Sequence, residues 1–342
     1  MTKSVVKVTT LVTEDGVPID AVHLPGPRDL AIIVAHGFTL SWQHQRVWRI
    51  ANRFNLAAGV IAFDFRGHGR SGGLSTLGDL EIKDLDVAVA YARELGYQRI
   101  AAVGFSMGSS VVLRHAGLIG GVDAVVSISG PGRWYYRGTE RMRRVHYAVE
   151  HRLGRFVTRH WLKTRISPEG WKLVPVPPAE AAAKIAPVPL LIVHGDQDPY
   201  FPPEHARQLY LAAREPKELW LIPGMGHAEV ACGNDLIDRI ARWLDLAARD
   251  PAALNDAAAP VAALDAAAPP VVTLNNAAPT RTTAPGAPPE DDSQPRAGSL
   301  HTQTRVSLAR PHAPPRGKCA TGGACAASVA APHRQRPCAR EM

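Results

Sequence analysis

The five residues GFSMG, Gly104 to Gly108, follow an apolar run at 100–103 and precede a helical pattern of small residues at 109–118. A serine on a sharp turn between strand and helix exposes its hydroxyl, which becomes reactive when a base reaches it and backbone N–H groups receive the charge that develops on the substrate. Glycines on both sides let the strand and the helix approach closely around a strained residue. The stretch therefore predicts that Ser106 is a nucleophile, although the same pattern also occurs by chance in glycine-rich chains.

Two candidate partners of this serine also lie directly after apolar runs. The run 190–193 leads into HGDQDPYFP, which contains Asp198, and the run 219–222 leads into PGMGH, which ends in His227. The chain order of serine, aspartate and histidine is typical of nucleophile, acid and base at the carboxyl ends of strands in one parallel sheet. We expect His227 to accept the proton of Ser106 and Asp198 to hold the imidazole in the required tautomer.

A fourth element precedes these three, where the apolar run 30–35 leads into HGF at residues 36–38. This loop predicts an oxyanion hole. The backbone N–H groups of Phe38 and of Met107, the residue after the serine, would stabilise a tetrahedral intermediate by a few kcal/mol. We interpret His36 as a structural residue that fixes the loop by hydrogen bonds, with a second catalytic base as the alternative.

Together these motifs resemble the α/β-hydrolase superfamily, in the branch that includes serine aminopeptidase-like and monoacylglycerol-lipase-like hydrolases. The resemblance extends over about 230 residues in family order, and it implies hydrolysis through an acyl-enzyme without implying a particular substrate. The matching stretches are HGF at 36–38, FDFRGHGRS at 63–71, GFSMGS at 104–109, HGDQDPYFP at 194–202 and PGMGH at 223–227.

Two further interpretations rest on this resemblance. The family pattern has the acid just before the PYFP turn, which favours Asp198 over Asp196 two residues earlier. In the family, the FDFRGHGRS stretch is a loop after a central strand. Asp64, Arg66 and His68 are therefore interpreted as braces for neighbouring loops, with direct substrate contact as the alternative.

Apolar runs and helical patterns alternate along the rest of the chain, which predicts an α/β fold with a mostly parallel, doubly wound sheet. Residues 5–12 and 17–24 predict an antiparallel strand pair that flanks the edge of this sheet. Further strands are predicted at 30–35, 59–63, 99–103, 123–128, 188–193 and 217–222, and helices at 45–57, 78–95, 107–118 and 234–248.

The same rhythm divides the chain into three parts. Residues 1–130 and 187–250 predict the α/β-hydrolase core, residues 131–186 a helical lid insertion, and residues 251–342 a disordered tail rich in Ala and Pro. The tail cannot bury enough apolar area to offset its chain entropy, and its weak repeat matches no solenoid unit.

The predicted lid combines apolar residues at helical spacing over 139–165 with seven arginines. One interpretation is a helix, or a pair of helices, that packs its apolar stripe on the core and leaves a solvated basic face. The alternative is a lid that guides anionic acyl substrates, or that rests on an anionic lipid surface through its arginines and through Trp134, Tyr135 and Tyr136.

Composition bears on localisation and partners. The net charge of +8 includes +3 from residues 251–342, so the catalytic part is mildly basic, and no stacking motif or recognition helix indicates nucleic acid binding. No apolar run reaches the ~18 residues of a membrane span, and the N-terminus lacks the apolar core of a signal peptide, which predicts a cytoplasmic protein. The spacing of the four cysteines indicates free thiols rather than a zinc site.

The sequence thus predicts a serine hydrolase that cleaves a small acyl substrate, an ester or a thioester, through an acyl-enzyme, with no metal and no organic cofactor. The alternatives are a peptidase, a cofactor-free perhydrolase or lyase that uses the same triad, and a non-catalytic binding protein with this fold. Relatives by fold with an Asp nucleophile, the haloalkane dehalogenases and epoxide hydrolases, are disfavoured because this chain has Ser106. The sequence does not indicate whether the protein is a monomer or an oligomer.

Overall fold

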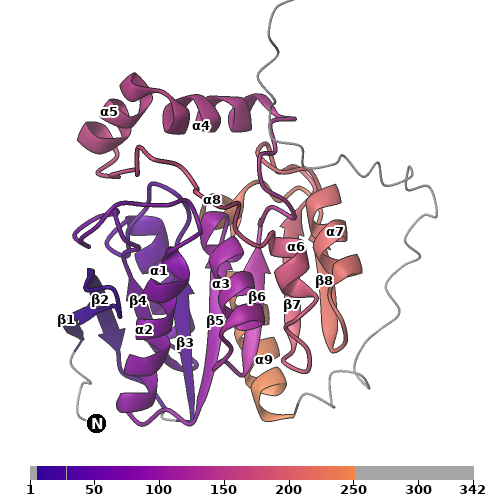
Figure 1. The fold of residues 1–342 in the computed structure, drawn as a ribbon. Helices are drawn as coiled ribbons and strands as arrows, with labels where there is room; N and C mark the ends of the chain where they lie inside the picture. Colours follow the sequence, from indigo (N-terminus) through magenta and orange to yellow (C-terminus); the bar gives the residue numbers. More distant parts are fainter. Residues whose placement is uncertain (1–5, 28, 251–342) are drawn as a thin grey trace, which may run out of the picture. The chain divides into compact units, whose positions relative to one another are not determined.

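Eight strands form one sheet within the described residues, 6–27 and 29–250, of the computed structural model (Figure 1). The strand order is β1-β2-β4-β3-β5-β6-β7-β8. Two neighbouring pairs, β1 with β2 and β2 with β4, are antiparallel, and the other pairs are parallel. The strands are β1 (Lys7–Val12), β2 (Pro18–Leu24), β3 (Leu30–Ala35), β4 (Gly59–Phe63), β5 (Arg99–Phe105), β6 (Ala124–Ile128), β7 (Leu190–Gly195) and β8 (Lys217–Ile222). The predicted mostly parallel sheet is confirmed, and the predicted tail, residues 251–342, lies outside the described residues.

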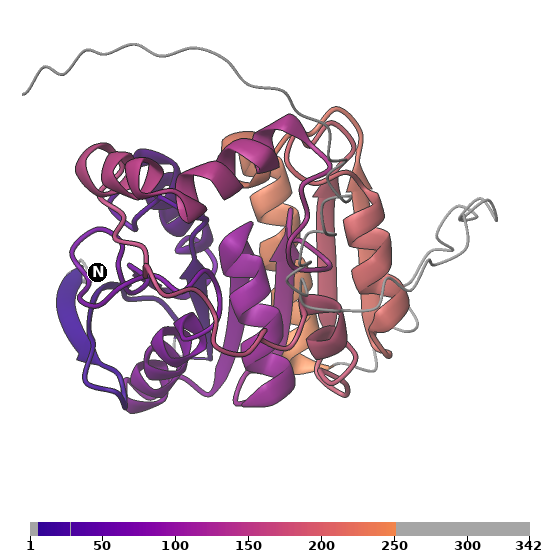
Figure 2. The same cartoon turned by 45° about the horizontal axis from the view of Figure 1, so that its top comes forward.

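Helices cover both faces of the sheet (Figures 1 and 2). One face packs against α1 (Gln45–Phe54) and α9 (Asn234–Arg249). The other face packs against α2 (Glu81–Glu94), α3 (Met107–Leu118), α6 (Pro178–Ala182) and α7 (Glu204–Ala212). Within the part of the chain that the structure describes, no helix has both the length and the apolarity needed to cross a bilayer.

The central strands are apolar throughout because both of their faces are covered. Every residue of β3, with the sequence LAIIVA, is buried. Ile33 packs in the core under α2 and α3, while its neighbours Ile32 and Val34 pack in the core under α1 and α9. Side chains alternate across a strand, so a continuous apolar run fills both layers at once.

Helix α2 begins at Glu81 rather than at the predicted residue 78. Leu77 and Gly78 have φ values of +59° and +99°, which an α-helix cannot continue. The Glu81 carboxylate accepts the backbone N–H groups of Thr76, Leu77 and Gly78, so the chain before the helix has its donors satisfied without helical turns.

Between β6 and β7 the chain leaves the sheet, and α4 (Glu140–Glu150) and α5 (Arg152–Trp161) lie across the carboxyl ends of the strands (Figure 1). The helical pattern over 139–165 thus forms a pair of helices, because His151 between them is extended, with ψ of 141°. Thr139 caps α4, since its side chain accepts the backbone N–H of Met142.

The segment that returns from α5 is tied to the loop after β4. The backbone N–H of Ser75 donates to the carbonyl of Arg165 at 2.7 Å, and the N–H of Ser167 donates to the carbonyl of Ser75 at 2.9 Å. The indole N–H of Trp171 donates to the carbonyl of Thr76. These bonds connect the inserted helices to the core at their C-terminal side.

A buried ion pair braces the loop that follows β4. Arg66 Nε donates to Asp84 Oδ1 of α2 at 2.8 Å, and both side chains are almost fully buried. The neighbouring Asp64 accepts two backbone N–H groups, those of Trp42 and Arg70. Asp64 and Arg66 therefore bond to neighbouring loops and to α2, as the brace interpretation expects.

We expect Arg66→Met to lower the free energy of unfolding by about 3–5 kcal/mol, because it leaves the buried Asp84 carboxylate without its counter-ion. Arg207→Met on α7 is the matched control, since it breaks an exposed pair with Glu204 and is expected to cost no more than about 1 kcal/mol. Equilibrium unfolding in urea measures both values. Equal losses in the two variants would contradict the role of the buried pair.

Candidate active site

Ser106 occupies the turn between β5 and α3 in a strained conformation. Its φ of +52° and ψ of −111° lie in a region that non-glycine residues rarely adopt. A Cβ added at Gly104 would lie 2.3 Å from the carbonyl oxygen of Gly108, and one at Gly108 would lie 2.2 Å from that of Ala35. The two glycines are therefore required by close approach of the backbone, as the sequence argument proposed.

The three predicted catalytic side chains form one line of hydrogen bonds. Ser106 Oγ lies 3.0 Å from His227 Nε2, and His227 Nδ1 lies 2.7 Å from Asp198 Oδ2. Because a carboxylate can only accept, Nδ1 carries the hydrogen and Nε2 accepts the serine O–H. The residues lie 92 and 29 positions apart in the sequence and meet at the carboxyl ends of β5, β7 and β8.

Asp198 is a buried acceptor. Its Oδ1 accepts the backbone N–H groups of Tyr200 and Phe201 at 2.8 and 3.1 Å, which leaves Oδ2 for the imidazole. Burial by itself raises the pKa of this carboxyl, but the hydrogen bond and the charge of His227, together with the two backbone donors, lower the pKa below its ordinary value. Asp198 is thus ionised where His227 needs a negative partner.

Asp196, the other carboxylate of this loop, lies apart from the imidazole. Its Oδ1 accepts the backbone N–H of Gly224 at 2.7 Å, and its side chain is exposed. The bond fixes the turn that leads from β8 toward His227. The two aspartates of the loop therefore have separate partners, and only Asp198 reaches the histidine.

The loop that carries His227, after β8, is anchored by a residue that follows β6, two strands away in the sheet. The backbone N–H of Ala228 donates to Ser129 Oγ at 3.0 Å, and both residues have positive φ, +45° and +51°. The ring of Tyr200 lies 4.3 Å from the imidazole, centroid to centroid. Ser129, directly after β6, was not predicted from the sequence, because nothing local distinguishes it from any serine at a strand end.

Two backbone donors lie beside the serine. Phe38 and Met107 line the same cavity as Ser106 and His227. Among the described residues, neither backbone N–H donates a hydrogen bond to another group of the protein. These are the two amides that the sequence assigns to an oxyanion hole.

His36 is a neutral structural residue in this geometry. Its Nδ1 donates to the carbonyl of Gly37 at 2.7 Å, and its Nε2 accepts the backbone N–H of Phe65 at 3.1 Å. Burial and the neighbouring His68 lower the pKa of His36 to about 3. Both nitrogens bond to backbone groups, so the ring fixes the HGF loop and has no nitrogen left to act as a second base.

Glu229 is a residue of the site that the sequence argument missed. The carboxylate is buried and accepts the backbone N–H of Gly37 at 2.6 Å, next to Phe38. A Cβ at Gly37 would lie 3.1 Å from this carboxylate and 3.4 Å from Ser106 Cβ, so the loop is packed between them. The sequence offers one indication of this role, an acidic residue two positions after His227. Acidic residues are common in the first turn of any helix, so this indication is not specific.

We expect Glu229→Ala to lower kcat by up to about 100-fold, because the HGF loop loses the acceptor that positions it and the Phe38 amide shifts. Glu229→Gln keeps an acceptor oxygen and is expected to stay within a few-fold of the native rate. Turnover of a short-chain ester by the two variants measures the difference. Equal losses in both would indicate that the charge, and not the hydrogen bond, matters.

Glu229 also predicts a pH dependence of stability. Burial raises the pKa of this carboxyl above its ordinary value, so the fold favours the protonated form. The contribution of the group to stability is then complete at low pH and is lost as the pH rises through the raised pKa. Glu229→Gln cannot ionise, and urea unfolding over a pH series is expected to show a smaller loss of stability with rising pH than in the native chain.

A cavity of about 770 Å³ opens onto Ser106. Its floor is formed by Ser106, His227 and residues 37–38 of the HGF loop, and its roof by the inserted segment, including Met142 and Val145 of α4 and Arg155 and Thr158 of α5. Most of the exposed lining is apolar. Cavities of this size and character hold small organic ligands.

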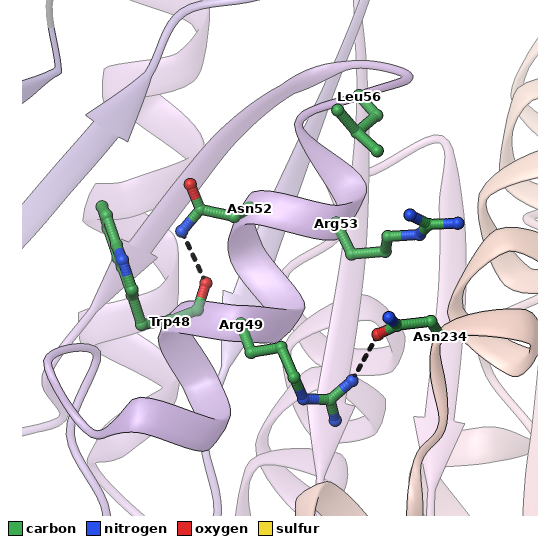
Figure 3. A pocket seen from close by; sticks show the side chains of 6 residues that line it. All are labelled: Trp48, Arg49, Asn52, Arg53, Leu56 and Asn234. Carbon is green, nitrogen blue, oxygen red and sulfur yellow. Dashed lines mark hydrogen bonds between the residues drawn. The ribbon is translucent and has the colours of Figure 1, made fainter.

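A second, smaller hollow of about 400 Å³ lies between α1 and the start of α9 (Figure 3). Arg49 and Asn234 face each other across it and form a hydrogen bond of 2.7 Å, and Arg53 bonds to Asp238. It shares no lining residue with the cavity at Ser106. Within residues 6–27 and 29–250, no cluster of three His, Cys, Asp or Glu side chains is arranged to hold a metal ion.

The sequence profile of the alpha/beta hydrolase family matches residues 32–235. The chain is 27% identical over 231 residues to the uncharacterized protein YfhR of Escherichia coli, covering 63% of this chain and 71% of that protein. A stretch of 110 residues is 36% identical to a non-heme chloroperoxidase of Streptomyces lividans and covers 31% of this chain and 38% of that protein.

Solved structures share this architecture. An esterase of Pyrococcus furiosus superposes with a TM-score of 0.58 at 26% identity, covering 70% of this chain and 90% of that chain. The alpha/beta hydrolase GrgF of a Penicillium species superposes with a TM-score of 0.57 at 21% identity, covering 72% of this chain and 98% of that chain, which indicates a common fold.

Proposed function

This chain belongs to the alpha/beta hydrolase family, and from this premise we propose that it is a serine hydrolase that cleaves a carboxylic ester or thioester through an acyl-enzyme. The observation that carries the proposal is the line from Ser106 Oγ through His227 to Asp198, with distances of 3.0 and 2.7 Å, at the floor of an apolar cavity. Similarity to the Pyrococcus furiosus esterase supports the same class of reaction. The narrower branch of the superfamily stays a prediction.

In the first half of the reaction, Ser106 Oγ attacks the carbonyl carbon while its proton passes to His227 Nε2. The ionised Asp198 stabilises the imidazolium that forms. The oxyanion of the tetrahedral intermediate accepts hydrogen bonds from the amides of Phe38 and Met107. The carbon–oxygen or carbon–sulfur bond to the leaving group then breaks, and His227 gives its proton to the departing alcohol or thiol.

In the second half, a water molecule takes the place of the leaving group. His227 accepts a proton from this water as it attacks the acyl carbon, and the same two amides hold the new oxyanion. The bond to Ser106 Oγ breaks, the serine recovers its proton from His227, and the carboxylic acid leaves. The neutral ring required at both steps is the form whose Nε2 accepts from the serine O–H.

The cavity indicates which part of the substrate is recognised. Apolar side chains, including Leu40, Met142, Val145 and Trp171, line its wall, so an acyl chain or an apolar alcohol gains from leaving water there. The proposal therefore names a substrate with an apolar group on one side of the ester.

Labelling with a fluorophosphonate, followed by turnover of p-nitrophenyl esters and matched thioesters of increasing acyl length, tests this proposal. We expect stoichiometric labelling, and turnover that rises with chain length until the cavity is filled. Failure to label would overturn the serine mechanism, and turnover of peptide substrates alone would assign the protein to the peptidases instead.

The similarity to the chloroperoxidase favours one second candidate, a cofactor-free perhydrolase on the same triad. In that reaction hydrogen peroxide replaces water in the attack on the acyl-enzyme, and a peracid leaves in place of the acid. Peracid formation from acetate and hydrogen peroxide, measured beside ester hydrolysis, distinguishes the two activities.

A further inference from the structure

Helix α5 presents an apolar face to solvent. Its four large apolar side chains are 63% (Leu153), 51% (Phe156), 40% (Val157) and 69% (Trp161) exposed. Their spacing of three, four and eight positions from the first places them on one side of the helix. Among the described residues nothing covers this side, which distinguishes it from the amphipathic helices α1 and α9, whose apolar faces are buried.

The opposite side of α5 faces the catalytic cavity. Gly154 and Thr158 are buried, and Arg155 and Thr158 line the cavity. None of the four exposed apolar residues belongs to the lining. The helix therefore has two separate faces, an inner one that encloses the substrate space and an outer apolar one. We call the outer face, Leu153, Phe156, Val157 and Trp161, the α5 outer face.

The segment that carries the α5 outer face is strongly positive, and two arginines lie at one border of the face. Residues 137–165 contain nine Lys or Arg against two Asp or Glu, a net charge of +7 with His neutral, whereas the whole chain carries +8. Arg152 and Arg159 are exposed and lie next to Phe156 around the helix, because each is about one helical turn from it. An apolar row with cations at its border is the pattern of a helix that lies in a membrane interface.

The positive charge of this segment also distinguishes between the molecules that could cover the α5 outer face. The tail, residues 251–342, carries a net charge of +3 and contains no Phe, Trp or Tyr, so its net charge has the same sign as that of the α5 segment and it offers no aromatic side chain to this face. A second copy would bring an equally cationic segment against this one, and like charges repel. The cations at its border and its apolar side chains therefore favour a partner that is anionic at its surface and apolar inside.

We propose that the α5 outer face docks this protein on an anionic lipid surface. Phe156, Val157 and Leu153 would enter the boundary between headgroups and acyl chains, and Trp161 would lie at that boundary with its indole N–H toward the headgroups. Arg152 and Arg159 would contact lipid phosphates. The alternative interpretation of the sequence named Trp134, Tyr135 and Tyr136 for such a contact; all three line the cavity, Trp134 and Tyr136 half-buried and Tyr135 exposed.

This docking stands apart from the proposed ester hydrolysis, since none of its residues touches the catalytic groups. It has one consequence for that reaction. Helix α5 also forms part of the roof of the cavity. When α5 lies on the bilayer, the cavity is therefore close to esters dissolved in the membrane.

Sedimentation of the full chain with phosphatidylcholine vesicles, and with vesicles that also contain phosphatidylglycerol, tests the proposal without any substrate. We expect binding to the anionic vesicles that weakens as salt is added. The variant Arg152→Gln/Arg159→Gln is expected to bind roughly 20- to 30-fold more weakly. The variant Phe156→Ser/Trp161→Ser is expected to lose at least about tenfold, since it removes two interfacial aromatic groups.

Two control variants carry the same types of change, apolar to Ser and Arg to Gln, at single positions on other surfaces. Leu211→Ser removes a side chain that is 71% exposed on α7, and Arg242→Gln removes an exposed charge on α9. Both are expected to bind like the native chain. All variants should keep native turnover of a soluble ester, so failed docking and failed catalysis give different results.

Three outcomes would overturn the proposal. They are equal binding to neutral and anionic vesicles, equal binding by the α5 variants and their controls, and binding to poly-glutamate without binding to vesicles, which would assign the face to an acidic protein. Dimers that dissociate in the Phe156→Ser/Trp161→Ser variant, with no vesicle binding by the native chain, would assign it to a second copy.

Discussion

Replacing Ser106 by Ala is expected to lower kcat for ester hydrolysis by about 10⁶-fold while leaving the fold intact. The hydroxyl at this position is the only atom of the line to His227 that can form the acyl bond, and its removal leaves the imidazole without a partner at Nε2. Because the alanine occupies the same strained turn, the free energy of unfolding should change little. Turnover of a p-nitrophenyl ester and fluorophosphonate labelling measure the effect.

Ser110→Ala is the matched control for this change. Ser110 lies one turn further along α3, lines the same cavity, and its buried Oγ has no hydrogen-bond partner among the described residues. We expect this variant to keep native turnover and native labelling. If Ser106→Ala kept more than a few per cent of the native rate, or if Ser110→Ala lost activity to the same degree, another nucleophile would have to carry the reaction.

The second large effect is expected at the acid. Asp198→Asn should lower kcat by about 10⁴-fold with little change in KM, because an amide at this position cannot stabilise the imidazolium and favours the wrong tautomer. Asp196→Asn removes the same charge from the same loop. Its carboxylate bonds to the backbone of Gly224 and not to His227, so the variant should retain turnover within a few-fold.

The pH profile of Asp198→Asn gives a second measurement. In the native chain the pKa of Asp198 is lowered in the fold, so the stability that this group contributes is present above its unfolded pKa and is lost as the pH falls through the folded one. Asn cannot titrate, and the variant should lose less stability in acid. Similar rate losses in Asp196→Asn and Asp198→Asn would contradict the assignment of the acid.

Much of this fold follows from local patterns. The strands that lie between two layers of helices are short, continuous apolar runs, and β3, with every residue buried, coincides with the predicted range 30–35. The end of α1 was predicted three residues too late, since Asn55 ends the helix by turning its side chain to the carbonyls of Leu24, Pro25 and Ala58. Helix α7 and the short helices α6 and α8 (Ala228–Ala231) were not predicted, because their apolar patterns are brief and depend on what they pack against.

Some residues of the candidate site could also be predicted from local sequence, and others could not. Ser106 and His227 could be predicted because each follows an apolar run within a distinctive short motif. Glu229 could not, because its carboxylate acts on Gly37, which lies 192 positions away in the sequence. The choice between Asp196 and Asp198 rested on resemblance alone until the structure placed one carboxylate at the imidazole and the other at a turn.

The sequence by itself determined the alternation of strands and helices, the strained turn at Ser106 and the candidate residues of the site, because periodicity and glycine positions act over a few residues. Only the tertiary structure decided which groups meet. Hydrogen bonds such as those of Glu229 with Gly37 and Asp198 with His227 join segments that chain connectivity leaves independent. The tertiary structure also decided that the α5 outer face is exposed. The same apolar spacing occurs in helices whose apolar face is buried and in helices whose apolar face is exposed, and only packing distinguishes them.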